Sequence, residues 1–123
     1  MHKAYGTIPP VVCLPGKLNQ VFMNILTNSI MAMEEKGDIF IETSSLDTQA
    51  RISIKDTGKG MPPEVVERIF DPFFTTRPVG QGTGLGLSIS YSIIKEHRGT
   101  IEVRSVPGAG TEFIISLPFQ RND

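Results

Sequence analysis

The sequence lacks the features that mark disulfide-bonded, zinc-binding and membrane-spanning domains. It has one cysteine, Cys13, which excludes an internal disulfide and favours a reducing compartment. No group of cysteines and histidines has the spacing of a zinc site. No apolar run approaches the roughly 20 residues that span a bilayer, and the amino terminus has no apolar stretch typical of a signal peptide. We expect a cytoplasmic domain without direct membrane contact, whether or not its parent protein is anchored in a membrane.

The sequence also lacks a charge imbalance. Its 12 basic and 13 acidic residues are mixed along the chain and give a formal net charge of -1. Because nucleic acids and anionic membranes are bound through basic patches, this balance argues against a nucleic-acid partner. What the chain does have is 123 residues with 39% hydrophobic content, enough to bury one continuous core. We expect residues 1–123 to form a single domain.

Three segments predict helices. From Lys17 to about Glu35, apolar side chains recur every three or four residues, and Gly37 is expected to end this helix. Residues 85–97 are apolar nearly all round, which predicts a buried helix that ends at Gly99. Between them, the run Pro62-Pro63-Glu64 predicts a short helix, because proline and a carboxylate are both favoured in a first turn.

Five segments predict strands, and the order of all these elements predicts the fold class. The strands are expected at residues 8–15, 38–44, 51–56, 100–105 and 111–118. The first of them stands alone at its end of the sequence, which suggests that the chain is a fragment. The expected architecture is an α/β (α+β) two-layer sandwich, with helices on one side of an open sheet.

One predicted strand carries an acidic residue among its core positions. Ile52, Ile54 and Asp56 share one face, because side chains alternate along a strand. A buried carboxylate needs a donor, and the exocyclic amine of adenine would serve. Gly58 and Gly60 would then let the backbone pass close to a flat ligand. The alternative interpretation is a plain turn, since Asp-Thr-Gly-Lys-Gly is also turn chemistry.

Polar residues on the first helix predict a metal site. Gln20, Asn24 and Asn28 are spaced four residues apart, so three amide side chains lie along one flank. Amide oxygens are suitable ligands for Mg²⁺. Asparagine is a mediocre helix former, disfavoured by roughly 0.5 kcal/mol against alanine, so two of them in mid-helix call for a reason. A solvated polar face is the alternative.

A glycine-rich run opens the buried helix and predicts a phosphate cradle. Residues 80–87 read Gly-Gln-Gly-Thr-Gly-Leu-Gly-Leu, which supplies free backbone N–H groups at the positive end of a helix. The run lacks the Gly-Lys-Ser/Thr of a P-loop and does not directly follow a strand, as a dinucleotide fingerprint would. Those two nucleotide folds are therefore disfavoured.

The segment before this run, residues 70–84, has neither helical nor strand periodicity. A loop of this length in a compact domain is usually functional, and we interpret it as a mobile lid. Within it, Thr75, Thr76 and Arg77 could reach phosphate oxygens, although Arg77 alone would also suit a surface loop. The aromatic residues that would anchor the lid are Phe70, Phe73 and Phe74, with Phe70 equally suited to an ordinary core position.

Four motifs taken in order resemble the conserved boxes of sensor histidine kinases, members of the GHKL superfamily. They are Gln20-Val-Phe-Met-Asn24-Ile-Leu-Thr-Asn28, Asp56-Thr-Gly-Lys-Gly60-Met61-Pro, Ile69-Phe70-Asp-Pro-Phe-Phe-Thr75-Thr76-Arg77 and Gly82-Thr83-Gly84-Leu85-Gly86-Leu87. Gly108-Ala-Gly-Thr111 is similar to a smaller third glycine box. The resemblance covers about residues 10–118, and it implies a Bergerat ATP-binding fold with a mixed, mostly antiparallel sheet and helices on one face.

The resemblance also implies roles for individual residues, with ATP and Mg²⁺ as cofactors. Asp56 would bind the adenine amine, and Asn28, together with Asn24, would hold Mg²⁺ and the phosphates as the catalytic pair. The remaining ATP-binding residues would be Gly58, Gly60, Met61, Phe70, Thr75, Thr76, Arg77, Gly82, Thr83, Gly84, Leu85, Gly86, Leu87 and Thr111.

The implied activity is that of a protein-histidine kinase in a two-component system. Related gyrase, mismatch-repair and chaperone ATPases carry a glutamate base where this chain has Asn24, and a neutral amide cannot accept a proton. General-base assistance is typically worth about 10²–10⁴ in rate, so hydrolysis is expected to be slow. Transfer of the γ-phosphate to a histidine on a separate dimerisation domain is favoured, with a response regulator as the next partner. Neither His2 nor His97 matches the phosphoacceptor motif.

Two departures and three alternatives accompany this reading. Met31 stands where many members have a basic residue, which is similar to the nitrogen-regulation branch, and Arg98 replaces a usual glycine.

An anti-sigma-factor-type serine kinase uses the same boxes without a dimerisation helix pair. A non-catalytic nucleotide-sensing module would bind ATP and change shape. An ATPase of a chaperone or topoisomerase cycle predicts a carboxylate base, against which Asn24 speaks.

Overall fold

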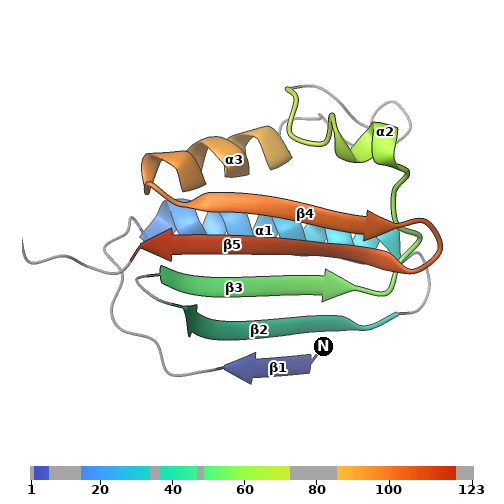
Figure 1. Cartoon of the computed structure of the whole chain (residues 1–123), viewed down its shortest axis with the longest axis horizontal. Helices are drawn as coiled ribbons and strands as arrows, with labels where there is room; N and C mark the ends of the chain where they lie inside the picture. The colour runs from blue at the N-terminus through green and yellow to red at the C-terminus, as the bar shows by residue number, and fades with distance from the viewer. Residues whose placement is uncertain (1, 6–14, 34–36, 47–48, 73–85, 119–123) are drawn as a thin grey trace, which may run out of the picture.

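A single mixed sheet forms one layer of the protein (Figure 1). The structure is a computed structural model that describes residues 2–5, 15–33, 37–46, 49–72 and 86–118. The sheet has the strand order β1-β2-β3-β5-β4, in which β1 runs parallel to β2 and the other neighbours are antiparallel. The strands are β1 (His2–Tyr5), β2 (Ile39–Leu46), β3 (Gln49–Asp56), β4 (Thr100–Val106) and β5 (Gly110–Pro118).

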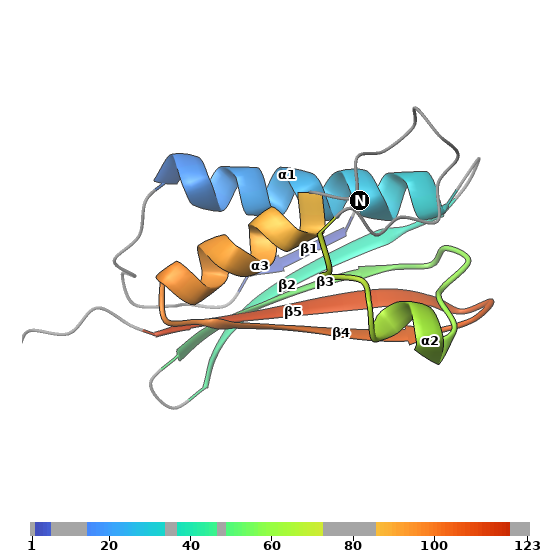
Figure 2. The same cartoon turned by 90° about the horizontal axis from the view of Figure 1, so that it is seen from above.

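Helices form the second layer, on one face of this sheet. Figure 2 shows α1 (Pro15–Ala32) and α3 (Gly86–Glu96) side by side over the strands, while the short α2 (Pro63–Val66) lies beside β4. None of the described helices combines the length and apolar character needed to cross a membrane. The two-layer α/β sandwich and the mostly antiparallel sheet predicted from the sequence are confirmed.

The core lies where the helix stripes meet the inner face of the sheet. Val21 and Ile25 on α1 are fully buried, as their helical spacing predicts. On the sheet, Ile54 of β3 is opposite Phe113 of β5, and both are at most 2% exposed. Burying each such side chain contributes on the order of 1.5–3 kcal/mol, so this seam holds the layers together.

The structure differs from the expected elements mainly at the amino terminus. The strand expected at residues 8–15 lies outside the described residues, except for Pro15, which is the first residue of α1. Proline suits that position, because its missing N–H would have no helical partner there. The short β1 was not expected from the sequence. Its four residues have no local signal, and only their parallel pairing with residues 40–43 of β2 makes them a strand.

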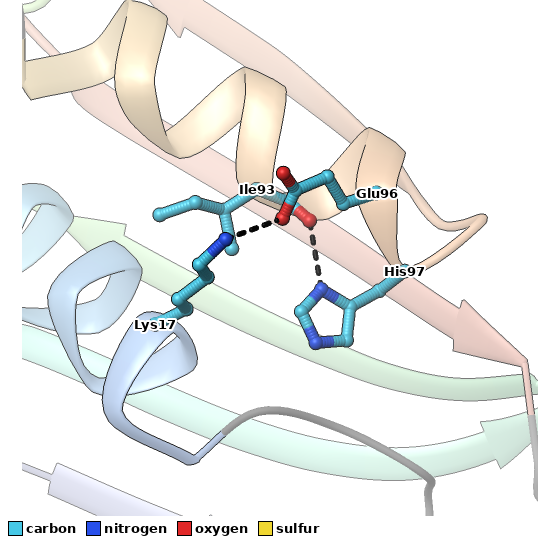
Figure 3. Close-up of polar contacts among 4 residues, drawn as sticks. All are labelled: Lys17, Ile93, Glu96 and His97. Atoms are coloured by element: carbon cyan, nitrogen blue, oxygen red, sulfur yellow. Dashed lines mark hydrogen bonds and ion pairs between the residues drawn. The ribbon is translucent and has the colours of Figure 1, made fainter.

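The two long helices run antiparallel to each other. At one end, Lys17 Nζ of α1 lies 3.0 Å from Glu96 Oε2 of α3, an exposed ion pair drawn in Figure 3. At the other end, the side chain of Asn24 contacts Gly86, the first residue of α3. Since helical N–H groups point toward the amino end, the amides of the first turn of α3 point along α1 toward its carboxyl-terminal half.

A left-handed residue ends α3. Arg98 has a φ of 59°, and its N–H donates to Lys95 O at 3.0 Å, while Gly99 N–H donates to Ile94 O at 2.9 Å. These two bonds form the Schellman motif, in which glycine is the usual left-handed residue. The histidine before them, His97, donates from Nδ1 to Ile93 O at 2.8 Å (Figure 3). The chain therefore has an arginine where the helix end favours glycine.

Candidate functional site

Asp56 is a buried carboxylate at the end of β3. It is 1% exposed, and its Oδ1 accepts hydrogen bonds from Gly58 N–H at 2.8 Å and Thr111 N–H at 3.3 Å. Among the described residues, Oδ2 accepts none. The turn interpretation and the ligand interpretation therefore each account for one oxygen: Oδ1 closes the turn, and Oδ2 is left for a donor from outside the described chain.

The two glycines after Asp56 are required by the protein's own packing. A Cβ on Gly58 would lie 2.7 Å from the carbonyl oxygen of Ala32 at the end of α1. Gly60 has a φ of +69°, and a Cβ there would collide with the carbonyl oxygen of Val106. From the sequence, both glycines were expected to allow close approach of a ligand. The structure gives a different reason, and their place in a base pocket stays a prediction.

The turn between β4 and β5 closes over the segment that follows Asp56. Ser105 Oγ accepts from Met61 N–H at 2.7 Å and lies 2.8 Å from Thr111 Oγ1. Lys59 O accepts from Gly108 N–H at 2.7 Å. On the other side, Lys59 N–H donates to Ala32 O at 3.1 Å. Residues 56–61 are thus held between the end of α1 and the β4–β5 turn, which brings four of the predicted residues, Gly58, Gly60, Met61 and Thr111, around Asp56.

Ser29 is a site residue that the sequence analysis missed. It is 1% exposed, and its Oγ has no hydrogen-bond partner among the described residues. It continues the buried stripe of Val21 and Ile25 and precedes Ala32 by nearly one helical turn, so it faces the sheet close to the 56–61 segment. An orphaned buried hydroxyl is unfavourable unless a ligand or water satisfies it. A polar residue in an apolar helix stripe was the signal that could have identified it.

The amide of Asn24 joins α1 to α3. Its Nδ2 donates to Gly86 O at 3.0 Å and to Ser90 Oγ at 3.2 Å, and Ser90 Oγ in turn donates to Gly86 O at 2.9 Å. Ser90 is fully buried, whereas Asn24 is half-buried. The structure therefore brings Asn24 and Gly86 into direct contact, which their separation in the sequence did not reveal.

The contact of Asn24 with α3 and the contact of Ala32 with the 56–61 segment both lie along one half of α1. Asn24, Asn28 and Ala32 follow each other at intervals of about 6 Å along the helix axis. The start of α3 meets Asn24, and the segment after Asp56 meets Ala32, which leaves half-buried Asn28 between them. The amino end of α3 points toward Asn28, and a helix amino end favours negative charge nearby.

The remaining predicted residues divide into core residues and residues outside the described chain. Phe70 is half-buried, with its ring centroid 5.4 Å from Tyr91 and 6.4 Å from Phe113, so it anchors its segment to the core. The side chain of Leu87 is also buried in the core. The residues outside the described chain are Phe73, Phe74, Thr75, Thr76, Arg77, Gly82, Thr83, Gly84 and Leu85.

A family model matches most of the chain. Residues 13–121 match the family described as histidine kinase-, DNA gyrase B-, and HSP90-like ATPase. Sporulation kinase E of Bacillus subtilis is 48% identical over 116 residues, which cover 94% of this chain and 15% of that protein. The chain thus spans less than a sixth of the length of this relative.

Two solved structures extend the similarity to the fold. The catalytic domain of histidine kinase ThkA in a nucleotide-free form superposes with a TM-score of 0.81 at 36% identity, over 95% of this chain and 79% of that one. Full-length ShkA in complex with AMPPNP superposes with a TM-score of 0.83 at 30% identity, over 96% of this chain and 25% of that one.

Proposed function

Because the chain belongs to the family of histidine kinase-, DNA gyrase B- and HSP90-like ATPases, we propose that it is the ATP-binding catalytic domain of a sensor histidine kinase. It transfers the γ-phosphate of ATP to a histidine on a separate dimerisation domain, from which a response regulator receives it. The parent protein works at or in the cytoplasm. The nucleotide lies along α1, with adenine at the 56–61 segment and phosphates at the start of α3.

The observation that carries the proposal is the buried carboxylate of Asp56. Its Oδ1 is satisfied by two backbone N–H groups, whereas Oδ2 accepts no hydrogen bond from the described residues. The exocyclic amine of adenine supplies the missing donor. The orphaned hydroxyl of Ser29 adds a second unsatisfied group on the same side of α1. These two vacant hydrogen-bonding groups fit a purine edge better than an apolar ligand, because an apolar ligand would leave both without a partner.

The phosphate end fits Mg²⁺ held together with a nucleotide. No group of three His, Cys, Asp or Glu residues that could hold a metal ion occurs in the described part of the chain. The candidate ligands are the amide oxygens of Asn28 and Asn24, which suit Mg²⁺ when phosphates and water complete its shell. Bound there, Mg²⁺ neutralises charge on the phosphates. The amides of Gly86 and Leu87 stabilise the same phosphates from α3.

A neutral residue at position 24 favours transfer to a protein over hydrolysis. Asn24 cannot accept a proton from water, and its Nδ2 is already used as a donor to Gly86 O. Neutral imidazole is itself a nucleophile, so phosphorylation of histidine requires positioning and charge stabilisation more than a base. The similarity to sporulation kinase E supports the same conclusion.

The first test is calorimetric titration of the chain with ADP and a non-hydrolysable ATP analogue, each with and without Mg²⁺. Binding of the analogue that tightens with Mg²⁺ is the expected result. No binding by a protein with native far-UV circular dichroism would refute the nucleotide site.

The second test identifies the acceptor. The chain is incubated with γ-labelled ATP and the histidine-bearing dimerisation domain of its parent protein. A labelled product that is stable in alkali and labile in acid is expected, because phosphohistidine has a P–N bond. A product stable in acid and labile in alkali would instead assign a serine kinase, and rapid release of free phosphate without a labelled protein would assign an ATPase.

A further inference from the structure

We infer that Asn24 is a positioning residue, whose amide nitrogen fastens the first residue of α3 to α1. This inference rests on the proposed function, since its purpose is to hold the first-turn amides of α3 against the phosphates. It assigns to Asn24 a role that differs from holding Mg²⁺, because it depends on the nitrogen of the side chain and on a partner, Ser90, that has no place in metal binding.

The donors and acceptors around Asn24 fix the orientation of its amide. The carbonyl oxygen of Gly86 can only accept, so the Asn24 atom 3.0 Å from it is the nitrogen. Nδ2 also donates to Ser90 Oγ at 3.2 Å, and the Ser90 hydroxyl donates to the same Gly86 oxygen at 2.9 Å. Three polar groups thus form a closed triangle of hydrogen bonds. Asn24 Oδ1 accepts no hydrogen bond within the described part of the chain.

The triangle is shielded and its geometry is specific to an amide. Ser90 is fully buried, so water cannot easily replace a lost bond. A carboxylate at position 24 would place an acceptor opposite the Gly86 carbonyl oxygen, and an alanine would leave that oxygen with one fewer donor. Only a side chain that carries its N–H groups at this distance from α1 satisfies both partners. The chemistry of α3 thus gives a reason for asparagine at position 24.

Fixing Gly86 also fixes the electrostatics of the site. Gly86 is the first residue of α3, and the N–H groups at the start of a helix point out of its amino end. They point toward Asn28, one helical turn beyond Asn24 on α1. A displacement of α3 along α1 would move these amides away from the phosphates, and misplacement by about 1 Å can lower a rate by about 100-fold. The Lys17–Glu96 ion pair at the far end is exposed and cannot supply this restraint alone.

The experiment compares Asn24→Ala, Ser90→Ala and the double variant with exposed controls on the same helices, Asn19→Ala and Ser92→Ala. The probe is the non-hydrolysable ATP analogue, titrated both in Mg²⁺ and in EDTA. We expect Asn24→Ala to weaken binding about tenfold and Ser90→Ala about threefold, because each removes two of the three hydrogen bonds but only Asn24→Ala breaks the direct link from α1 to Gly86. The double variant is expected to lie within about twofold of Asn24→Ala, and the losses are expected to persist in EDTA.

A role of Asn24 as a metal ligand alone gives a different pattern, which would overturn the inference. The loss in Asn24→Ala would then vanish in EDTA, and Ser90→Ala would bind like the wild type. Asn24→Asp adds a second discriminating variant, with Asn19→Asp as its charge-matched control. Under the positioning role it binds more weakly than Asn24→Ala, whereas a metal ligand would keep or improve Mg²⁺-linked binding.

Folding and the proposed function are controlled separately. Circular dichroism is recorded for each variant, and Ser90→Ala, which keeps the Asn24 side chain, carries the test if Asn24→Ala does not fold. A folded wild-type chain that binds no nucleotide would overturn both the proposed function and this inference. Binding by the wild type with no effect of either substitution would overturn the inference alone.

Discussion

Asp56→Asn is expected to separate nucleotide affinity from protein stability. The amide oxygen of asparagine can replace Oδ1 and keep the hydrogen bonds from Gly58 N–H and Thr111 N–H. The amide nitrogen then replaces Oδ2 and presents a donor where the adenine amine also donates. The substitution also removes a buried negative charge, so the free energy of unfolding without nucleotide is expected to stay within about 1 kcal/mol of the wild type or to rise.

The loss of affinity follows from one hydrogen bond to a charged group. Such a bond contributes about 1.5–3 kcal/mol, which corresponds to a loss of about 10- to 150-fold in affinity for an ATP analogue. Guanine carries an oxygen where adenine carries its amine, so the new N–H can donate to it. The affinity for a GTP analogue is therefore expected to stay the same or to increase, and the ratio between the two nucleotides is expected to narrow.

The assay is titration calorimetry with both analogues, beside unfolding in urea without ligand. Asp38→Asn is the matched control: it removes an exposed carboxylate, and its backbone is hydrogen-bonded to neighbouring Thr57. An affinity for the ATP analogue within twofold of the wild type, in a folded Asp56→Asn protein, would refute the adenine assignment. Equal losses for both analogues would show that Asp56 acts on the shape of the site and not on base recognition.

Three further predictions test the local physics by urea unfolding. Arg98→Gly is expected to raise the free energy of unfolding by about 0.5–1 kcal/mol, because glycine adopts the left-handed conformation without strain; a lower midpoint would contradict this. Ser29→Ala is expected to raise it by about 1 kcal/mol by removing an unpaired buried hydroxyl, and a decrease would reveal an additional partner. Gly110→Ala is expected to be more destabilising than Gly108→Ala by at least about 2 kcal/mol. Both glycines have positive φ, but only a Cβ on Gly110 would collide with the Asp56 carbonyl oxygen. Equal losses of stability in the two variants would exclude the collision.

The site could be predicted in part because two of its signals are local. Alternation along β3 placed Asp56 on the buried face, and the structure confirms that burial. Helical spacing placed Asn24 and Asn28 on one flank of α1. The reason for Gly58 and Gly60 could not be predicted, because the atoms they avoid belong to Ala32 and Val106, which are distant in the sequence.

The secondary-structure elements, and the functional groups that they carry, follow from the amino-acid sequence alone. Periodicity gave α1, α3 and the antiparallel strands, since each pattern depends only on near neighbours along the chain. The order of the motifs gave the family, because residue types at fixed spacing are directly readable.

Which strands pair and which hydrogen-bonding groups come into contact depends on tertiary packing. The parallel pairing of β1, the triangle of Asn24, Ser90 and Gly86, and the orphaned hydroxyl of Ser29 all depend on contacts between separate elements. Such contacts arise when a shared core brings the elements together, and the hydrogen-bond partner of a buried group is then set by packing geometry. For this chain, the sequence specifies the donors and acceptors, and packing specifies which of them remain for a ligand.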